Sequence, residues 1–189
     1  MTGEQKNLID DLLAESLKEI AKTKPIEKIT IKEITDKAGV IRPTFYNHFQ
    51  DKYELVEYIV DHEILQPVNE LLDERNFEDA LMDIFSSIED EKEFYMKAVG
   101  IEGQNSFGII LRSSIKELIL RHIDRKSLEQ KLPYEWLSVE SLADFYSEPI
   151  SYLLIDWIKT GMKIPKEEIV KGIIFVSTHS PIDVVPLSE

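Results

Sequence analysis

Residues 29–52 read ITIKEITDKAGVIRPTFYNHFQDK, and this stretch decides the fold of the chain. Thr30 and Glu33 have the Ser/Thr-x-x-Glu spacing of a capping box, which predicts that a helix begins here. Gly39 predicts the end of that helix, because glycine readily takes the positive φ of a helix C-terminus. Pro43 favours the first turn of a second helix. Two short helices around a glycine-bearing turn predict a helix-turn-helix, whose second helix enters the DNA major groove.

The second of these helices is expected to separate apolar from polar side chains. Phe45 and Phe49 are four residues apart, so they share one face, and we expect them to point into the core. The polar residues between them fall mostly on other faces. Arginine pairs with guanine, asparagine with adenine, and threonine with the methyl group of thymine. Amide groups at the helix starts near residues 30–32 and 52 can also hold phosphate oxygens.

A set of closely spaced residues resembles the signature of TetR-family transcriptional regulators. These residues are Ala38-Gly39-Val40, Thr44-Phe45-Tyr46, His48-Phe49, Asp51-Lys52 and Leu55. The resemblance is densest over about residues 10–58 and needs no gap. It implies an all-α, TetR-like fold with an N-terminal three-helix helix-turn-helix domain and a C-terminal helical bundle. The apolar pattern along the chain predicts about nine helices. One position departs from the family, which usually has a small polar residue where this chain has Ile41, a residue that cannot cap a helix.

Chemistry and resemblance together define the predicted DNA-contacting residues. The resemblance implies that Tyr46 and Lys52 contact phosphate and that Thr44 faces the groove. Two alternatives stay open: Tyr46 packs in the core, and His48 is a solvated surface residue. The complete predicted set is Thr30, Lys32, Arg42, Pro43, Thr44, Tyr46, Asn47, His48 and Lys52.

The net charge of −14 at first argues against a DNA-binding protein. Residues 1–52 hold nine basic and nine acidic residues, however, so residues 53–189 carry the whole negative charge. Exposed charges farther apart than about 8 Å are largely screened at physiological salt. A neutral DNA-binding segment predicts modest non-specific affinity and a strong reliance on dimerisation and on a specific site.

The chain is expected to divide into three parts. Residues 1–52 are predicted to form the helix-turn-helix DNA-binding domain, 53–180 a helical domain for effector binding and dimerisation, and 181–189 a loose tail. A long helix is expected from residue 52 to about residue 72, and Pro67 should kink it or end one segment before it. Another helix is expected over 138–161 with an interruption at Pro149. The first boundary therefore lies inside a shared helix, as transmission of motion requires.

The C-terminal helices are expected to form a homodimer. Residues 138–178 carry more apolar surface than one helix pair can bury, and regulators that read paired half-sites about 34 Å apart are two-fold dimers. The resemblance implies that the last two helices make this interface. The alternative is that the same residues are core within one chain. The expected interface residues are Phe145, Leu153, Trp157, Ile169 and Ile173.

The resemblance also implies an effector site between helices of the C-terminal domain. The alternative is that the same apolar and aromatic residues are simply core. The effector is an unknown small molecule or a protein partner. The segment WIKTG at residues 157–161 resembles a family branch that includes regulators of dihydroxyacetone-kinase operons. The candidate ligand-binding residues are Phe85, Tyr95, Met96, Phe107, Ile110 and Leu111.

Catalysis and bound cofactors find little support in the sequence. GQNSFG at residues 103–108 has the glycine spacing of a phosphate loop, but no Lys-Ser/Thr pair follows. The four histidines are scattered, and the chain has no cysteine for a disulfide, a thiolate metal site or thiol catalysis. We find no signal peptide and no 18-residue apolar run. The chain is therefore expected to be cytoplasmic, with no enzymatic activity, cofactor, metal or membrane partner.

The predicted function is a DNA-binding transcriptional regulator that represses genes from a double-stranded DNA operator. An effector bound in the C-terminal domain would shift the helix that begins at Lys52. The two DNA-binding domains of the homodimer would then no longer match the half-site spacing, and operator affinity would fall. The alternative is an activator or adaptor that is controlled by a protein partner.

Overall fold

The computed structural model describes residues 3–134 and 136–179, and all regular structure in these two ranges is helical. This confirms the predicted all-α class. The predicted tail at 181–189 lies outside the described residues. In chain order the elements are α1 (Gly3–Ala21), the 3-10 turn η1 (Ile26–Lys28), α2 (Ile31–Ala38), α3 (Arg42–Tyr46), α4 (Lys52–Ile59), the π-helical turn η2 (Val60–Leu65), α5 (Asn69–Asp73), α6 (Phe77–Asp90), α7 (Lys92–Ala98), the 3-10 turn η3 (Gly103–Asn105), α8 (Phe107–His122), α9 (Arg125–Glu129), α10 (Val139–Lys159) and α11 (Lys166–Thr178).

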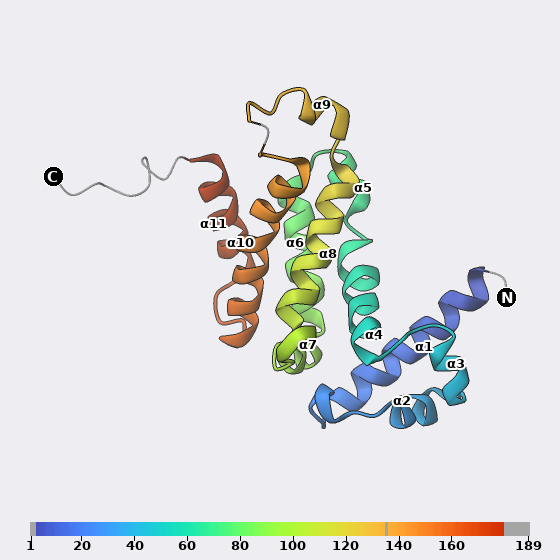
Figure 1. The fold of residues 1–189 in the computed structure, drawn as a ribbon. Helices are drawn as coiled ribbons and strands as arrows, with labels where there is room; N and C mark the ends of the chain where they lie inside the picture. The colour runs from blue at the N-terminus through green and yellow to red at the C-terminus, as the bar shows by residue number, and fades with distance from the viewer. Residues whose placement is uncertain (1–2, 135, 180–189) are drawn as a thin grey trace.

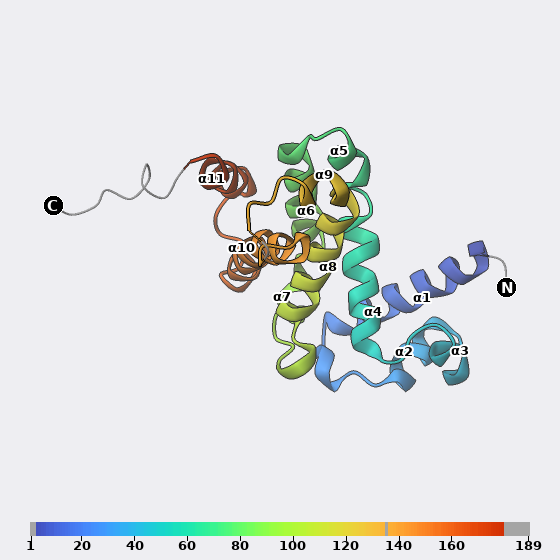
Figure 2. The same ribbon diagram turned by 45° about the horizontal axis from the view of Figure 1, so that its top comes forward.

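The helices gather into two groups joined by α4 (Figure 1). Helices α1–α3 lie at one end, and we call them, with η1, the DNA-binding unit after the role predicted for them. Helices α5–α11 form the second group, which we call the body, with α8 and α10 packed along each other. Figure 2 shows α10 and α11 side by side on the side of the body away from the DNA-binding unit. One continuous apolar core runs through both groups, from Leu13 of α1 to Ile173 of α11.

The start and end of α2 follow local sequence signals. The Thr30 hydroxyl accepts a hydrogen bond from the Glu33 amide at 3.3 Å, and the Glu33 carboxylate accepts one from the Thr30 amide at 2.9 Å. This confirms the predicted capping box. Gly39 ends the helix at a φ of +69°, in the left-handed region that favours glycine. The helix-turn-helix therefore rests on signals that are local in the sequence.

The helix expected over residues 52–72 is broken into three pieces. Helix α4 passes into the π-helical turn η2, in which the Gln66 amide bonds to the Asp61 carbonyl five residues back, at 2.7 Å. Pro67 then interrupts the helix, because proline has no amide hydrogen to donate, and α5 begins two residues later. Single π-helical turns occur often at functional sites. Here the turn lies between the DNA-binding unit and the body.

Helix α10 runs through Pro149 without a break, so the predicted interruption is wrong. The missing amide of Pro149 leaves the Phe145 carbonyl without its helical partner. Both residues are exposed, so that carbonyl lies on the solvent side of the helix, where water can satisfy it. Gly161 ends the segment at a φ of +82°. Among the described residues, no helix combines the length and the apolar character that crossing a membrane requires.

Candidate nucleic-acid interface

Helix α3 presents a row of polar side chains to solvent. It begins after Ile41, which makes no side-chain capping bond, and Pro43 lies in its first turn. Phe45 is fully buried, as predicted, and the Tyr46 side chain on the next position is 57% exposed. The alternative that Tyr46 is a core residue is therefore wrong. Arg42 and Asn47 are also exposed, and Thr44 is half-buried.

His48 lies beneath this row and does not belong to it. Its Nδ1 atom is 2.6 Å from a carboxylate oxygen of Asp10 in α1, and the two side chains are 2% and 8% exposed. The imidazole is therefore neither solvated nor accessible to a base edge in this conformation, which corrects both expectations for this residue. The pair instead holds the C-terminal end of the recognition helix against α1. No local sequence pattern reveals it, because the partners are 38 residues apart.

The ammonium group of Lys52 forms hydrogen bonds with backbone oxygens and is not free to contact phosphate. Its ammonium group donates to the carbonyls of Ile26, Glu27 and Ile29 at 2.9, 2.6 and 2.9 Å. These bonds use all three of its protons. Burial lowers the pKa of Lys52, opposed by the charge of nearby Glu27. The geometry thus gives Lys52 a structural task, which is to hold η1 and the start of α2 against the start of α4.

The N-terminal ends of α2 and α4 differ in what they offer an anion. At α4 the Asp51 carboxylate already accepts bonds from the amides of Tyr53 and Glu54 at 2.7 and 3.0 Å. That end is therefore capped from within the chain. At α2, Thr30 and Lys32 are both exposed, although Lys32 forms an ion pair with Asp36 one turn on. Exposed pairs of this kind are weak and exchange readily.

The candidate ligand-binding residues form packed core rather than one pocket. Phe85, Tyr95, Phe107 and Leu111 are at most 1% exposed, and Ile110 is 8% exposed. Met96 points outward and is 39% exposed. Phe107 borders a surface hollow of about 300 Å³ beside α10, and Ile110 borders a different hollow of about 270 Å³ beside α4. The geometry thus favours the core interpretation for this set.

An apolar groove of about 460 Å³ runs between α10 and α11. Of the predicted interface residues, Leu153, Ile169 and Ile173 line it, and Phe145 nearby on α10 is 72% exposed. Trp157 is 2% exposed and packs on the Phe85 ring, at 5.0 Å between ring centres. It is therefore core, and the expectation that it lies at an interface is corrected. Further exposed apolar side chains outside the predicted interface set are Tyr146, Tyr152, Phe175 and Val176 on these helices and Ile164 in the segment between them.

A helix-turn-helix carried on a helical body through a shared helix is the architecture of a DNA-binding transcriptional regulator. Two family models match the chain. Residues 13–59 match the model described as "Bacterial regulatory proteins, tetR family", and residues 75–178 match "Transcriptional regulator C-terminal region". The second match covers more than half of the chain. The chain therefore belongs to the TetR family of transcriptional regulators.

The similar proteins include both an activator and a repressor. The chain is similar to the HTH-type dhaKLM operon transcriptional activator DhaS of Lactococcus lactis subsp. lactis (strain IL1403), with 22% identity over 130 residues, 68% of this chain and 67% of the relative. A solved structure of the dihydroxyacetone kinase operon activator DhaS matches with a TM-score of 0.61 at 20% identity, covering 89% of this chain and 93% of that one. NalD, the secondary repressor of the MexAB-OprM multidrug efflux pump in Pseudomonas aeruginosa, matches with a TM-score of 0.53 at 15% identity, covering 91% and 94%. These structures establish the fold alone.

Proposed function

We propose that this regulator binds a double-stranded DNA operator with the exposed face of α3 in the major groove. The observation that carries the proposal is the row of exposed polar side chains on α3 above the buried Phe45. Arginine and asparagine are the side chains best suited to reading guanine and adenine. The proposed contact residues are Thr30, Lys32, Arg42, Pro43, Thr44, Tyr46 and Asn47.

His48 and Lys52 have a different place in this proposal. The imidazole of His48 braces α3 against α1, and the ammonium of Lys52 braces η1 against α4. Both therefore act on DNA binding by fixing the angle of the recognition helix. Direct contact with DNA is not part of their proposed role.

The proposed operator-binding form is a homodimer. The supporting observation is the apolar groove between α10 and α11, which lies on exposed helices remote from the DNA-binding unit. A two-fold dimer uses the same patch on both protomers, so a self-complementary apolar face fits it. Residues 1–52 and 53–180 would then be the DNA-binding and the effector and dimerisation domains.

Repression is the proposed direction of control, with release from the operator by an effector that acts on the body. Activation under the control of a protein partner is the second candidate. The packing of the candidate ligand residues into core favours this second candidate, because it leaves no shared pocket among them. The similarity to an operon activator points the same way.

A gel-shift assay with the DNA upstream of the regulator's own gene tests the proposal. We expect retardation at low salt that resists competitor DNA, and Arg42→Ala should weaken it. Retardation that competitor DNA abolishes would overturn operator recognition. A reporter gene behind the bound fragment separates the two directions of control: expression falls with a repressor and rises with an activator.

A further inference from the structure

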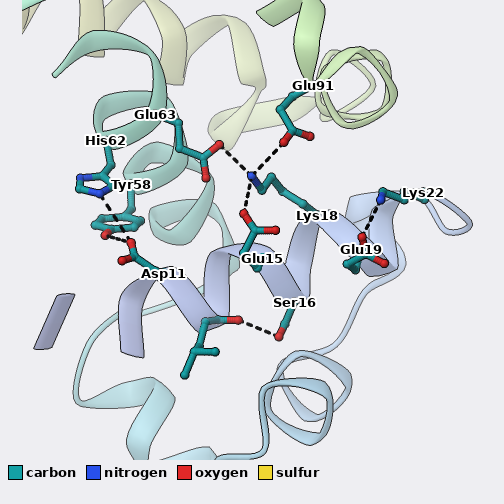
Figure 3. A network of polar contacts seen from close by, with 11 residues as sticks. Asp11, Glu15, Ser16, Lys18, Glu19, Lys22, Tyr58, His62, Glu63 and Glu91 are labelled. Atoms are coloured by element: carbon teal, nitrogen blue, oxygen red, sulfur yellow. Dashed lines mark hydrogen bonds and ion pairs between the residues drawn. The ribbon is translucent and has the colours of Figure 1, made fainter. Parts of the chain in front are cut away.

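A buried lysine joins the DNA-binding unit to the body. The Lys18 side chain of α1 is 6% exposed, and its ammonium group meets three carboxylates (Figure 3). Glu15 of the same helix lies at 2.7 Å, Glu63 of η2 at 2.9 Å and Glu91, the residue before α7, at 3.3 Å. Three separate parts of the chain therefore converge on one cation.

The charges in this cluster depend strongly on one another. Burial alone would lower the pKa of Lys18, but hydrogen bonds to Glu15 and Glu63 raise it above its ordinary value. Burial raises the pKa of Glu63, and the bond with Lys18 partly offsets that rise. Three carboxylates around one ammonium repel each other when that ammonium is withdrawn. The cluster therefore has a strong preference for the arrangement in which Lys18 lies at its centre.

A second contact ties the DNA-binding unit to the other end of α7. The carboxylate of Glu27 in η1 accepts a hydrogen bond from the backbone amide of Glu102, at 3.3 Å. Glu91 precedes α7 and Glu102 follows it, so the DNA-binding unit touches both flanks of this seven-residue helix. Helix α1 also packs directly against α7. We call these two contacts, Lys18–Glu91 and Glu27–Glu102, the α7 clamp.

The inward side of α7 carries an unused hydrogen-bonding group. Tyr95 is 1% exposed, its ring packs on Phe107 at 6.0 Å between centres, and no described residue forms a hydrogen bond with its hydroxyl. Leaving a buried hydroxyl unpaired costs about 1–3 kcal/mol. Burial, together with the charges of Glu63 and Glu91, raises the pKa of Tyr95. Glu91 stands four residues before Tyr95, whose amide donates to the Glu91 carbonyl at 3.1 Å, and Lys18 holds the carboxylates of Glu91 and Glu63.

We propose that Lys18 and Glu27 are positioning residues that set the angle of the DNA-binding unit through α7. We also propose that the Tyr95 hydroxyl donates a hydrogen bond to Glu63 or Glu91 when the ion pair between Lys18 and that carboxylate is broken. The clamp then has two arrangements, one that holds α1 and one that releases it. A ligand or partner that favours either arrangement at α7 shifts the DNA-binding unit by its differential affinity. This inference rests on the proposed function, because it concerns regulation of the same DNA-binding unit.

The absence of cysteine from the chain makes a direct test possible. Cysteines introduced at the exposed positions Lys37 of α2 and Asp83 of α6 would carry two spin labels on one protomer. Pulsed electron paramagnetic resonance then measures the distance between the DNA-binding unit and the body. Doubly labelled full-length protein diluted with unlabelled protein gives this intramolecular distance. The readout requires neither DNA nor a particular oligomeric state.

The expected results differ between three substitutions. Lys18→Met and Glu91→Gln should each add a second, resolved distance population to the single one of the parent protein. Lys22→Met is the control, because Lys22 lies in the turn just after α1 and forms its ion pair with Glu19 on the exposed surface, and its distribution should not change. Glu91 is 42% exposed, so Glu91→Gln tests the clamp even if Lys18→Met fails to fold.

Tyr95→Phe tests the second half of the proposal. Added to Lys18→Met, or to Glu91→Gln if Lys18→Met does not fold, it should reduce the second population. Folded Glu91→Gln protein with the parental distribution would overturn the clamp. A second population that Tyr95→Phe leaves unchanged would overturn the role of the hydroxyl. A protein with the expected distances that binds no operator would refute the proposed function and leave the clamp standing.

Discussion

Tyr46 and Asn47 are neighbours at the end of α3, but their chemistry assigns them different tasks. A tyrosine hydroxyl on a phosphate adds affinity for every sequence, whereas an asparagine amide on a base edge distinguishes one base pair. We predict that Tyr46→Ala weakens binding to specific and non-specific DNA alike. Asn47→Ala should lower the preference at one operator position by about 1–3 kcal/mol. Titrations with a set of single-base operator variants measure both effects.

A control variant and a contradicting result can be stated for the roles of Tyr46 and Asn47. Lys126→Ala removes an exposed charge on α9, away from the DNA-binding unit, and should leave both affinities unchanged. If Tyr46→Ala altered preference at a single base pair and Asn47→Ala weakened all sequences equally, the two roles would have to be exchanged.

The Asp10–His48 pair supports a prediction about stability. Asp10→Ala leaves the buried imidazole without its partner, and an unsatisfied buried polar group costs about 1–3 kcal/mol. We expect a loss of stability in that range, measured by urea unfolding. Asp36→Ala is the control, because it removes an exposed carboxylate from a surface pair and should change stability far less. Equal losses in the two variants would contradict a bracing role for the pair.

Glu33 gives the DNA-binding unit a specific dependence on pH. Its hydrogen bond with Lys24, together with bonds from the backbone and hydroxyl of Thr30, lowers the pKa of Glu33 from about 4.5 to about 2. The unfolded chain therefore binds more protons between these values, so the stabilising contribution is complete above about pH 4.5 and disappears as the pH falls toward 2. Glu33→Gln keeps an oxygen for the capping bond but cannot titrate.

Urea unfolding at a series of pH values tests this prediction. The difference in stability between the parent and Glu33→Gln should be constant above about pH 4.5 and should shrink at lower pH. A difference that stays constant down to pH 2 would show that Glu33 titrates normally in the folded state.

At the scale of single elements, local signals were predictable and distant contacts were not. The capping box at Thr30 and the positive φ of Gly39 are encoded within four residues of the helix ends they control. The sequence around Lys52 does not predict its hydrogen bonds, because the three carbonyl partners lie 23 to 26 residues earlier in the chain. A lysine at a helix start satisfies the same pattern whether it binds phosphate or backbone. Only the fold decides between these uses.

The same limit explains the two long helices. Pro67 and Pro149 carry identical sequence signals, but helix α10 tolerates its proline and the α4 segment does not. At Pro149 both affected groups are exposed to water. The π-helical turn lies directly before Pro67, and its Gln66 amide bonds to the Asp61 carbonyl five residues back, a pattern that a proline alone does not predict. Pro67 is exposed as well, but Glu63, whose carbonyl lies four residues before it, is half-buried, so the proline signal alone does not decide the outcome.

The α10–α11 groove supports a prediction for the pair of helices. Val176 is 66% exposed, and it lines the groove with Leu153. We predict that Leu153→Glu combined with Val176→Glu converts the protein to monomers and lowers operator affinity by at least about tenfold, since one monomer holds only one half-site. Sedimentation velocity and DNA titration measure the two effects.

Phe77→Glu provides the matched control for this surface. Phe77 is 57% exposed at the start of α6, so the change places one glutamate, half of the charge added by the double variant, on another exposed apolar residue. It should leave both the oligomeric state and the affinity unchanged. A folded Leu153→Glu/Val176→Glu protein that remains dimeric would place the interface elsewhere.

At the scale of the whole molecule, charge is separated from the proposed DNA contact. The DNA-binding segment at residues 1–52 is neutral, whereas residues 53–189 hold the full charge of −14. The acidic body repels DNA phosphates unless the α3 end approaches first, so it favours one orientation of approach. Few phosphates are then neutralised per protomer, and the affinity should depend only moderately on salt concentration. Specific base contacts and the two half-sites bound by a dimer must supply the rest of the operator affinity.

The most direct test of the account is selection of binding sites from random double-stranded DNA with the full-length protein. We expect enrichment of one two-fold symmetric sequence whose half-sites are about 10–10.5 base pairs apart, or a multiple of that spacing. We also expect that Asn47→Ala, Arg42→Ala or both change the selected bases. The contrary result would be a folded dimer that enriches no sequence, or a sequence that is unchanged when both residues are replaced.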